Sequence, residues 1–576
     1  MIVLGLGGAF GHDPSAALLV DGRLVAAAEE ERFRRVKHAH GIPASQAARF
    51  CLKQAGLTPD DVQIVAFPFS AATQERQRSR YAARVRSHNP VRAVRAFTEH
   101  NRKIAKKRAY LERTLREIGI DSRRVRVEEI DHHLAHASSA FHLSGWDSAA
   151  ILSLDGAGEY TTTLIAEGRA DGSIREIATF VEPDSLGNYF AGITEFLGFL
   201  PNDGEFKVMG MAPYGDPSKV DMSFALTWGG GSYRVEDGYF WAPWWRRAST
   251  AGGEAKSLNC DRRLLEKLGP PRRGDDMLEP YIHIAAAVQK QLEEVVVHLL
   301  EHHLSDVLKQ CGGRLCVAGG CALNVKMNQV LLNHPLVSEI FVQPVANDAG
   351  TSLGAATFAA WREGDRIEPM RHLYLGPEFT NEEIELALRH SGLPHARSDA
   401  IENCVAEMLA NGQVVAWFQG RMEFGPRSLG NRSILANPSY KGMADEINVQ
   451  IKFREKWRPF CPSVHPDHAE EVLGSRHPSP YMILAFNACA ASRNKIAEAV
   501  HIDGTIRPQV IDRAANPRYF QVINRFHEMT GVPALINTSL NRRGEPMICR
   551  PEEAIAMFLG SGLQHLAMGD YLVGKS

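Results

Sequence analysis

The stretch LGLGGAFGHDPSAALL, residues 4–19, joins two apolar segments through a glycine-rich turn. A second stretch of this kind, LSLDGAGEY, occupies residues 152–160, and a third, VAGGCALN, occupies residues 317–324. Glycines that follow a strand let backbone N–H groups approach a phosphate closely, and a helix that starts there adds a favourable potential. Because two similar hairpins, at 4–22 and 152–168, contain such turns, the sequence indicates a duplicated α/β domain that holds a nucleotide between two lobes.

The chain alternates apolar strand patterns with amphipathic helix patterns, which predicts the α/β class. The predicted strands span residues 2–8, 15–28, 62–67, 339–343 and 414–419, and the predicted helices span 44–55, 282–309, 348–361, 381–390 and 400–411. The pattern breaks at REGDRIEPMRHLYLG, residues 362–376, and then restarts. We therefore expect two domains, with a boundary near 365–375.

The bulk composition is that of an ordinary globular protein. Hydrophobic residues make up 44% and charged residues 23%, and a net charge of −2 gives no case for binding nucleic acid or membranes. No run of about 18 apolar residues is present, and MIVLGLGGAF at the start lacks the basic region and cleavage site of a signal peptide. The nine cysteines are dispersed, which favours reduced thiols that pack in the core of a cytoplasmic protein.

Residues 75–117 are dense in arginine and lysine. Runs of one charge usually cover the exposed face of a helix, so a solvated helical insertion is the favoured interpretation. The alternative is a rim that attracts anions beside a phosphate site.

Two histidines in DHHLAHASSA, residues 131–140, indicate a metal site. Asp131 is a suitable N-cap, so His132 and His136 are expected one turn apart on the same helix face, where their imidazoles can share an ion. Asp348, at the predicted start of another helix, is a candidate third ligand, although it could instead serve only as an N-cap. Two histidines and one carboxylate suit Fe(II), Mn(II) or Zn(II).

Four turn-rich segments of the C-terminal third concentrate arginine, lysine, asparagine and serine. They are FGPRSLGNRSILANP (424–438), IKFREKWRPFCPSV (451–464), DGTIRPQV (503–510) and INTSLNRRGEPMI (536–548). Arginine binds phosphate through two parallel hydrogen bonds, lysine acts as a point charge, and the neighbouring proline and glycine residues indicate fixed loops. We therefore favour a polyanion site over a solvated surface.

Several of these motifs resemble those of a known family. HHLAHA, GGCALN and NDAGTSLGAA, with GHDPSAALLVDGRLVAAAEEERFRRVKH near the start and EFKVMGMAPYGDP at 205–217, are similar to motifs of the antibiotic and nodulation O-carbamoyltransferases, the NodU/CmcH family. The resemblance covers nearly the whole chain apart from the basic segment and residues 220–275. It implies a Kae1-like domain, of the duplicated actin/Hsp70/sugar-kinase type, at residues 1–367, and a YrdC-like α/β domain at residues 368–576.

The resemblance implies an enzyme that works in two steps. The C-terminal domain would combine carbamoyl phosphate with ATP and Mg²⁺ to give carbamoyladenylate and pyrophosphate. The N-terminal domain would hold Fe(II), with Mn or Zn as alternatives, and would transfer the carbamoyl group to a hydroxyl of a natural product such as a macrolide or glycosylated antibiotic. The implied partners are this small-molecule acceptor and a second copy of the chain in a homodimer, without nucleic acid or membrane.

Within this implied reaction we assign hypothetical roles to individual residues. His12 would be the general base, because an imidazole titrates near neutral pH, Asp13 is a weaker candidate for that role, and Lys37 would steady the developing negative charge. In the N-terminal domain the metal ligands would be His132, His136 and Asp348, and the adenylate would lie against Asp155, Gly156, Gly158, Gly319, Gly320, Asn324 and Asn347. In the C-terminal domain carbamoyl phosphate and ATP would bind Arg427, Lys452, Arg458, Arg507, Asn537 and Ser539.

Three other functions are weighed against this one. Threonylcarbamoylation of tRNA uses the same two folds, but a pI of about 6.9 argues against a nucleic-acid enzyme. Carbamoyl transfer in hydrogenase maturation would bring C-x-x-C pairs, which the sequence lacks. A nucleotide-gated scaffold would not need cation and metal motifs in both domains.

Aromatic residues gather between residues 227 and 245. They include Trp228, Tyr239, Phe240, Trp241, Trp244 and Trp245. These residues are candidates for the wall of an acceptor pocket, and an ordinary packed loop is the alternative.

Overall fold

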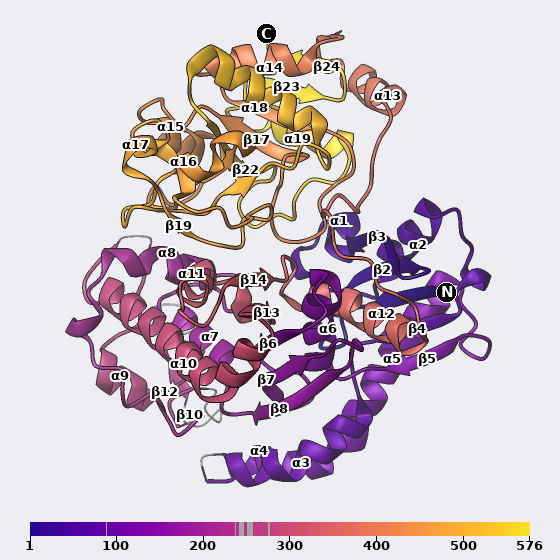
Figure 1. Ribbon diagram of the computed structural model, residues 1–576, viewed down its shortest axis with the longest axis vertical. Helices are drawn as coiled ribbons and strands as arrows, with labels where there is room; N and C mark the ends of the chain where they lie inside the picture. The colour runs from indigo at the N-terminus through magenta and orange to yellow at the C-terminus, as the bar shows by residue number, and fades with distance from the viewer. Residues whose placement is uncertain (88, 237, 241–246, 250–256, 275–276, 576) are drawn as a thin grey trace. The chain divides into compact units, whose positions relative to one another are not determined.

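A computed structural model describes the chain except for residues 88, 237, 241–246, 250–256, 275–276 and 576. Two compact units make up the described chain (Figure 1). The first unit comprises Met1–Leu24, Pro43–Ala48 and Gly56–Pro369, and the second comprises Val25–Ile42, Arg49–Ala55 and Met370–Ser576. None of the described helices is both long and apolar enough to span a membrane.

Two five-stranded sheets of the first unit share one strand pattern. Their strands are β1 Ile2–Leu6, β2 Ser15–Val20, β3 Arg23–Glu29, β4 Ile64–Phe67, β5 Arg126–Glu129, β6 Ala149–Leu154, β7 Thr161–Gly168, β8 Ile174–Val181, β13 Arg314–Ala318 and β14 Glu339–Val342. The orders are β3-β2-β1-β4-β5 and β8-β7-β6-β13-β14. In each sheet the central strand pairs antiparallel with the next strand of the chain and parallel with a later one. This repeated topology agrees with the internal duplication that the glycine-rich hairpins indicate.

Small residues bring two helices of the first unit into close contact. Its helices are α3 Ala71–Val85, α4 Pro90–Thr98, α5 His100–Ile118, α6 His132–Ser144, α7 Leu186–Phe196, α8 Glu205–Met211, α9 Arg262–Leu268, α10 Tyr281–Gln310, α11 Val325–Leu332 and α12 Thr351–Arg362. Helix α2 Ser45–Gln54 belongs to the first unit up to Ala48 and to the second from Arg49. Ala355 of α12 packs on the first sheet, and Ala137 and Phe141 of α6 pack on the second. A Cβ on Gly354 would lie 1.7 Å from the carbonyl oxygen of Ala135, so only glycine allows this helix contact.

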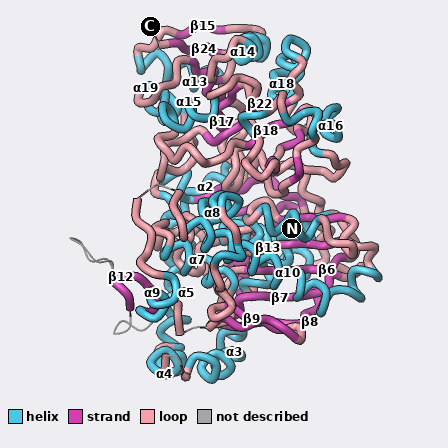
Figure 2. Tube along the Cα trace, turned by 90° about the vertical axis from the view of Figure 1, so that its left-hand side faces the viewer, coloured by secondary structure: helices cyan, strands magenta, loops and turns pink. Residues whose placement is uncertain are grey.

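The basic segment forms the predicted helical insertion. Helices α3 and α4 lie along the edge of the first unit near β8, and α5 returns toward β5 (Figures 1 and 2). Short strand pairs complete the unit: β9 Leu226–Gly229 with β10 Ser232–Val235, and β11 Arg247–Ser249 with β12 Ser257–Asp261. Many cations of the insertion are exposed, as expected for a solvated helix face, but Lys107 is partly buried.

The second unit is built on one eight-stranded mixed sheet of order β15-β24-β23-β16-β17-β22-β18-β21. The strands of this sheet are β15 His395–Arg397, β16 Val415–Phe418, β17 Arg432–Ala436, β18 Cys461–Val464, β21 Gln509–Val510, β22 Ala534–Ser539, β23 His565–Met568 and β24 Tyr571–Gly574. A separate pair is formed by β19 Phe486–Asn487 and β20 Thr505–Ile506. The helices of the second unit are α1 Glu30–Arg34, α13 Asn381–Ser391, α14 Ile401–Ala410, α15 Met443–Glu446, α16 Ala469–Leu473, α17 Ala490–Arg493, α18 Pro517–Thr530 and α19 Pro551–Leu559. The core packs α13 and α19 against the sheet through Leu388, Phe558 and Leu566.

Two N-terminal segments, Val25–Ile42 and Arg49–Ala55, pack with the second unit, although the sequence analysis assigned them to the N-terminal domain. Arg32 shows the physical reason. Its guanidinium donates to both carboxylate oxygens of Glu29 at 2.9 Å, and to the carbonyl of Gly425 at 2.8 Å. Arg32 and Gly425 are 393 residues apart, so their contact leaves no local pattern in the sequence. A domain boundary drawn from the break at residues 362–376 therefore does not show that Val25–Ile42 packs with the second unit.

Candidate metal centre and anion site

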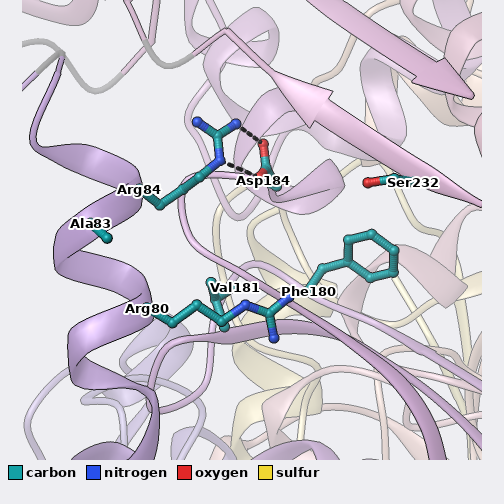
Figure 3. A pocket seen from close by; sticks show the side chains of 7 residues that line it. All are labelled: Arg80, Ala83, Arg84, Phe180, Val181, Asp184 and Ser232. Atoms are coloured by element: carbon teal, nitrogen blue, oxygen red, sulfur yellow. Dashed lines mark hydrogen bonds and ion pairs between the residues drawn. The ribbon is translucent and has the colours of Figure 1, made fainter.

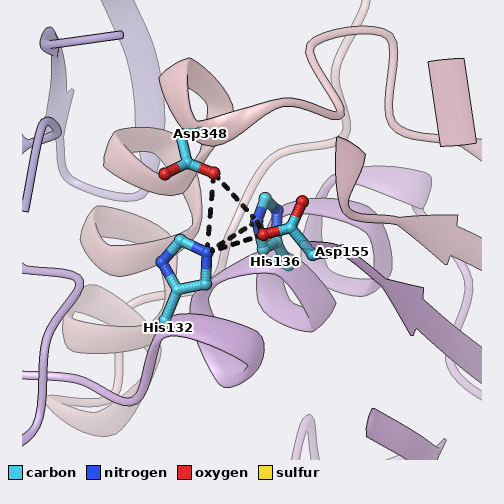
Figure 4. A group of neighbouring side chains, drawn as sticks. All are labelled: His132, His136, Asp155 and Asp348. Atoms are coloured by element: carbon cyan, nitrogen blue, oxygen red, sulfur yellow. Dashed lines mark hydrogen bonds and ion pairs between the residues drawn. The ribbon is translucent and has the colours of Figure 1, made fainter. Parts of the chain in front are cut away.

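Four buried side chains of the first unit converge on one point (Figure 4). The Nε2 atoms of His132 and His136 lie 3.2 Å apart, and Oδ2 of Asp155 lies 3.3 Å from the His132 Nε2. Oδ1 of Asp348 lies 3.6 and 3.8 Å from the Nε2 atoms of His132 and His136. One ligand atom from each residue lies within 4.8 Å of all the others, so the four atoms could bind a single metal ion.

Helix α6 and two strands of the second sheet bring these side chains together. The N-cap Asp131 accepts the N–H of Leu134 at 2.9 Å, as predicted, and both histidines follow it in α6. Asp155 follows β6, and Asp348 follows β14 in a short 3-10 turn. The N-cap of α12 is Gly350, so the interpretation of Asp348 as no more than an N-cap is wrong.

Asp155 is a candidate metal ligand that the sequence analysis placed only in the adenylate site. Its Oδ1 accepts the N–H of Gly320 at 2.9 Å, which turns Oδ2 toward the two histidines. The signal that could have identified it is its place in the duplication, because Asp155 ends the central strand of the second sheet, where a glycine loop begins.

The charges of this metal cluster favour a cation. Burial opposes protonation of His132, but the carboxylates of Asp348 and Asp155 outweigh it and raise its pKa to about 9. Burial likewise opposes ionisation of Asp155, yet the hydrogen bond with His132 and the charge of His136 hold the pKa of that carboxyl well below its usual range. Two buried carboxylates this close need positive charge beside them. Two imidazole nitrogens and two carboxylate oxygens therefore fit a divalent transition metal.

His12 stands beside the metal cluster. Its Nε2 lies 3.7 Å from Oδ2 of Asp348, and its Nδ1 lies 3.2 Å from Oδ2 of Asp13. The attraction of Asp348 outweighs burial and, with Asp13, raises the pKa of His12 to about 9. A cation bound to Asp348 would oppose this attraction. The structure thus brings His12 and Asp13, two predicted catalytic residues, to the predicted metal ligands.

Glycine loops border the metal cluster. Gly319 has a positive φ of 86°, and a Cβ there would lie 2.1 Å from the carbonyl oxygen of Leu154, so a side chain is excluded. Gly158 packs against His132, where a Cβ would lie 2.8 Å from the histidine Cβ. Gly156 follows Asp155 directly in the same loop. Three glycines that were predicted to bind adenylate, Gly156, Gly158 and Gly319, therefore lie beside the residues of the metal cluster.

The two predicted asparagines of the first unit differ in their bonding. Asn324 caps α11 and exchanges two hydrogen bonds with Gln289, at 2.8 and 3.0 Å. Asn347 immediately precedes Asp348, and its buried Oδ1 has no hydrogen-bond partner among the described residues. Asn347 therefore has an acceptor available to a ligand, whereas the Asn324 side chain is already bonded.

Lys452 is the centre of a second cluster, in the other unit. Its Nζ lies 2.7 Å from the carbonyl oxygens of Ser539 and Asn541 and from Oδ1 of Asn541, and 3.3 Å from Oγ of Ser539. Burial and the charges of Arg454 and Arg458 lower the pKa of Lys452 well below its ordinary value. Asn541 and Arg454 were not among the predicted site residues, although both lie in the polar segments that the sequence analysis singled out.

Four arginines complete this cation cluster. Burial and the charges of Arg507 and Arg458 lower the pKa of Arg427 to about 9. Burial and the charge of Arg458 also lower the pKa of Arg454. The buried Nε of Arg427 and Nη2 of Arg454 have no hydrogen-bond partner among the described residues, while Arg507 donates to Sγ of Cys461 at 2.8 and 3.0 Å. Partly buried cations that repel one another and keep unused, buried N–H donors are suited to a bound anion.

Asn537 and Lys37 are two further predicted site residues of the second unit. Asn537 is buried and its amide nitrogen is 3.0 Å from Oγ of Ser463 and 3.1 Å from Oε1 of Gln509, so it braces the sheet. Lys37 was assigned to carbamoyl transfer in the N-terminal domain. It lies in the segment Val25–Ile42 of the second unit, and its charge contributes to the lowered pKa of Lys452.

Comparison with known families accounts for most of the chain. A family model described as Carbamoyltransferase N-terminus matches residues 2–357, and one described as Carbamoyltransferase C-terminus matches residues 406–575. The chain belongs to the carbamoyltransferase family. It is therefore a transferase enzyme, as its motifs predict.

Similar proteins have been named for nodulation. Nodulation protein NolNO of Sinorhizobium fredii is 35% identical to this carbamoyltransferase over 99% of the chain and 80% of its own length. Nodulation protein NolO of Bradyrhizobium diazoefficiens is 38% identical over 77% of the chain and 79% of its own length. A crystal structure of full-length HypF in the phosphate- and nucleotide-bound form covers 64% of this chain and 56% of that one, but at 13% identity and a TM-score of 0.34, which is too low to establish a shared fold.

The predicted aromatic wall of this carbamoyltransferase is only partly described. Trp241, Trp244 and Trp245 lie outside the described residues. Phe240 is buried and packs edge-on against Tyr189, with ring centroids 5.3 Å apart. For Phe240 the alternative of an ordinary packed loop is therefore correct.

A cavity of about 360 Å³ lies elsewhere in the first unit, beside α3 (Figure 3). It is lined by Arg80, Ala83, Arg84, Phe180, Val181, Asp184 and Ser232. Arg84 donates two hydrogen bonds of 2.8 Å to Asp184, and Arg80 donates to the Thr179 carbonyl at 2.9 Å. Because both arginines are already bonded and no predicted site residue lines the cavity, we do not assign it to the reaction.

Proposed function

We propose that this carbamoyltransferase uses ATP and carbamoyl phosphate, and that each unit performs one half of the reaction. The second unit would hydrolyse carbamoyl phosphate with one water molecule to carbamate and phosphate. A carbamate oxygen would then attack the α-phosphorus of ATP, which gives carbamoyladenylate and releases pyrophosphate. The first unit would then transfer the carbamoyl group to a hydroxyl of a small-molecule natural product and release AMP. The observation that carries the proposal is the cation cluster of the second unit, because its unused N–H donors match the phosphate groups of both substrates.

In the second unit the cation cluster would bind and neutralise phosphates. Arg427 and Arg454 would use their unpaired N–H groups on phosphate oxygens, and Lys452 would add a positive charge fixed by Ser539 and Asn541. Such positioning and charge neutralisation supply most of the catalysis in phosphoryl chemistry. Mg²⁺ bound to ATP would be part of the nucleotide substrate.

In the first unit the proposed metal ligands are His132, His136, Asp348 and, added from the geometry, Asp155. A bound Fe(II), Mn(II) or Zn(II) ion would supply Lewis acidity beside the carbamoyl group. His12 would accept the proton of the attacking hydroxyl, since its ring lies beside Asp348 and its Nδ1 is held by Asp13. The glycine loops would hold the adenylate phosphate through backbone N–H groups.

The acceptor class is a proposal that follows from the family. We propose tailoring of an antibiotic or a related natural product, with a macrolide or a glycosylated compound as the first acceptors to test. Modification of tRNA with a threonylcarbamoyl group is the alternative, and it would require bicarbonate and threonine in place of carbamoyl phosphate.

The test is an assay of pyrophosphate release from ATP by the full-length protein without acceptor. We expect release that depends on carbamoyl phosphate and is nearly lost in Arg427→Ala. Arg389→Ala is the matched control, because this arginine of α13 is 69% exposed and pairs with Glu385 of the same helix. Release that requires bicarbonate and threonine instead would overturn the proposal in favour of the tRNA reaction.

A further inference from the structure

Lys107 of the basic insertion faces the interior of the first unit. Its ammonium donates to the carbonyl of Ala9 at 2.9 Å and lies 3.5 Å from the ring centroid of Phe10 and 5.1 Å from that of Phe69. By contrast, the side chain of Arg102 on the same helix is 76% exposed. Lys107 therefore combines a charge-assisted hydrogen bond with two cation–π contacts, all directed at one face of the unit.

The loop that receives these contacts carries His12. Tyr110, one turn further along α5, donates its hydroxyl to the carbonyl of Gly7 at 3.4 Å. The ring of Phe10 stands edge-on to the imidazole of His132, with centroids 4.7 Å apart. The segment 7–13 thus contacts α5 through its backbone and the metal cluster through Phe10 and His12.

The backbone of this loop depends on support from outside. Gly8, Gly11 and Asp13 all have positive φ, at 88°, 92° and 48°. Asp13 in particular occupies a region that residues with a side chain rarely adopt, and such conformations persist only where surrounding contacts hold them. A Cβ on Gly8 would lie 2.4 Å from the hydroxyl of Tyr110, so α5 is packed tightly against the loop.

We propose that Lys107 is a positioning residue for carbamoyl transfer. By bonding the Ala9 carbonyl and covering Phe10, it holds the loop in the shape that presents His12 to Asp348. The proposal rests on the proposed transfer reaction of the first unit. A neutral side chain at this position would lose both kinds of contact, and a displacement of about 1 Å in a reacting group can lower a rate by about 100-fold.

Hydrogen exchange tests the structural part without any need for activity. We would compare wild type with Lys107→Met, Lys107→Arg and Lys106→Met in the full-length protein. Lys106 is the matched control, because it is the neighbouring lysine of the same helix and is exposed. In Lys107→Met, the amides of residues 7–13 should exchange about tenfold faster, with the rest of the first unit unchanged. Lys106→Met should match wild type, and unchanged exchange in Lys107→Met would overturn the proposal.

Steady-state kinetics tests the functional part. Lys107→Met should lower the kcat of carbamoyl transfer by about 10-fold to 100-fold, with the KM of the acceptor and the rate of pyrophosphate release unchanged. Lys107→Arg should restore most of the kcat, because a guanidinium can keep the hydrogen bond and the ring contacts. If Lys107→Met instead raised the KM of the acceptor and kept the wild-type kcat, the positioning role would be overturned in favour of direct contact between Lys107 and a ligand. If wild type itself formed no carbamoylated product, the proposed function would fail, while hydrogen exchange would still decide whether Lys107 holds the loop.

Discussion

Replacing Arg32 by methionine should destabilise the second unit strongly. Arg32 and its partner Glu29 are each 5% exposed, and the guanidinium also bonds the carbonyl of Gly425. Removal of one partner from a buried pair leaves an uncompensated charge and costs about 3–5 kcal/mol. In a unit of about 150–250 residues, each kcal/mol lowers Tm by about 2–4 °C. We therefore expect the Tm of this unit, measured by scanning calorimetry, to fall by about 6–20 °C.

The pH dependence of the Arg32→Met variant has a definite sign. Burial already raises the pKa of Glu29 above its usual range, although Arg32 opposes this shift. The folded state therefore binds the Glu29 proton more tightly than the unfolded state, and stability is lost as pH rises above the unfolded pKa. Without Arg32 the folded pKa rises further, so acidification from pH 7 toward pH 5 should stabilise the variant relative to wild type.

A second substitution separates charge from packing at this position. Glu29→Gln in the Arg32→Met background removes the unpaired charge and should recover part of the lost Tm. Arg389→Met, at an exposed helix position, is the control and should change Tm little. A loss below about 2 °C in Arg32→Met, or no recovery in the double variant, would refute the assignment of this pair to the core of the second unit.

Three further predictions concern the two candidate sites. Asp155→Asn removes one negative charge from the metal cluster, so metal affinity, measured by titration with elemental analysis, should fall by at least about tenfold; wild-type affinity would exclude Asp155 as a ligand. His12→Asn should abolish product formation while pyrophosphate release continues, and loss of both activities together would contradict its role as base. Asn541→Ala should slow pyrophosphate release by about tenfold, because Lys452 loses a partner, whereas Asn537→Ala should mainly lower Tm; the reverse pattern would contradict both assignments.

The approach of His132 and His136 on α6 was predictable because the signal is local. Asp131 caps the helix, and a spacing of four residues then places His132 and His136 on one face whatever the rest of the fold does. The place of Asp348 at the start of a turn could be predicted from the strand pattern that precedes it. Asp155 was harder, because its direction depends on the hydrogen bond from Gly320, which lies in another part of the chain.

Long-range packing explains what the sequence did not show. The polar segments of the C-terminal third correctly indicated a cation cluster, yet they did not distinguish Asn537, which is bonded inside the sheet, from Asn541, which contacts Lys452. Both asparagines occur in one short motif. Asn537 lies within β22 and bonds inside the sheet, whereas Asn541 follows the strand and reaches Lys452, and the sequence alone does not show this difference. The contact of Lys107 with Ala9 could not be predicted for the same reason, since a run of cations does not show which side chain points into the unit.

Mass spectrometry of carbamoyladenylate in His136→Ala would decide whether activation and transfer occupy separate sites. The variant would be incubated with ATP, Mg²⁺, carbamoyl phosphate and an acceptor that wild type carbamoylates. His136 belongs to the metal cluster of the first unit, and the cation cluster belongs to the second. We therefore expect the variant to form carbamoyladenylate at the wild-type rate or above and to form no carbamoylated acceptor. Loss of the adenylate together with the product would contradict the division of the reaction between two sites.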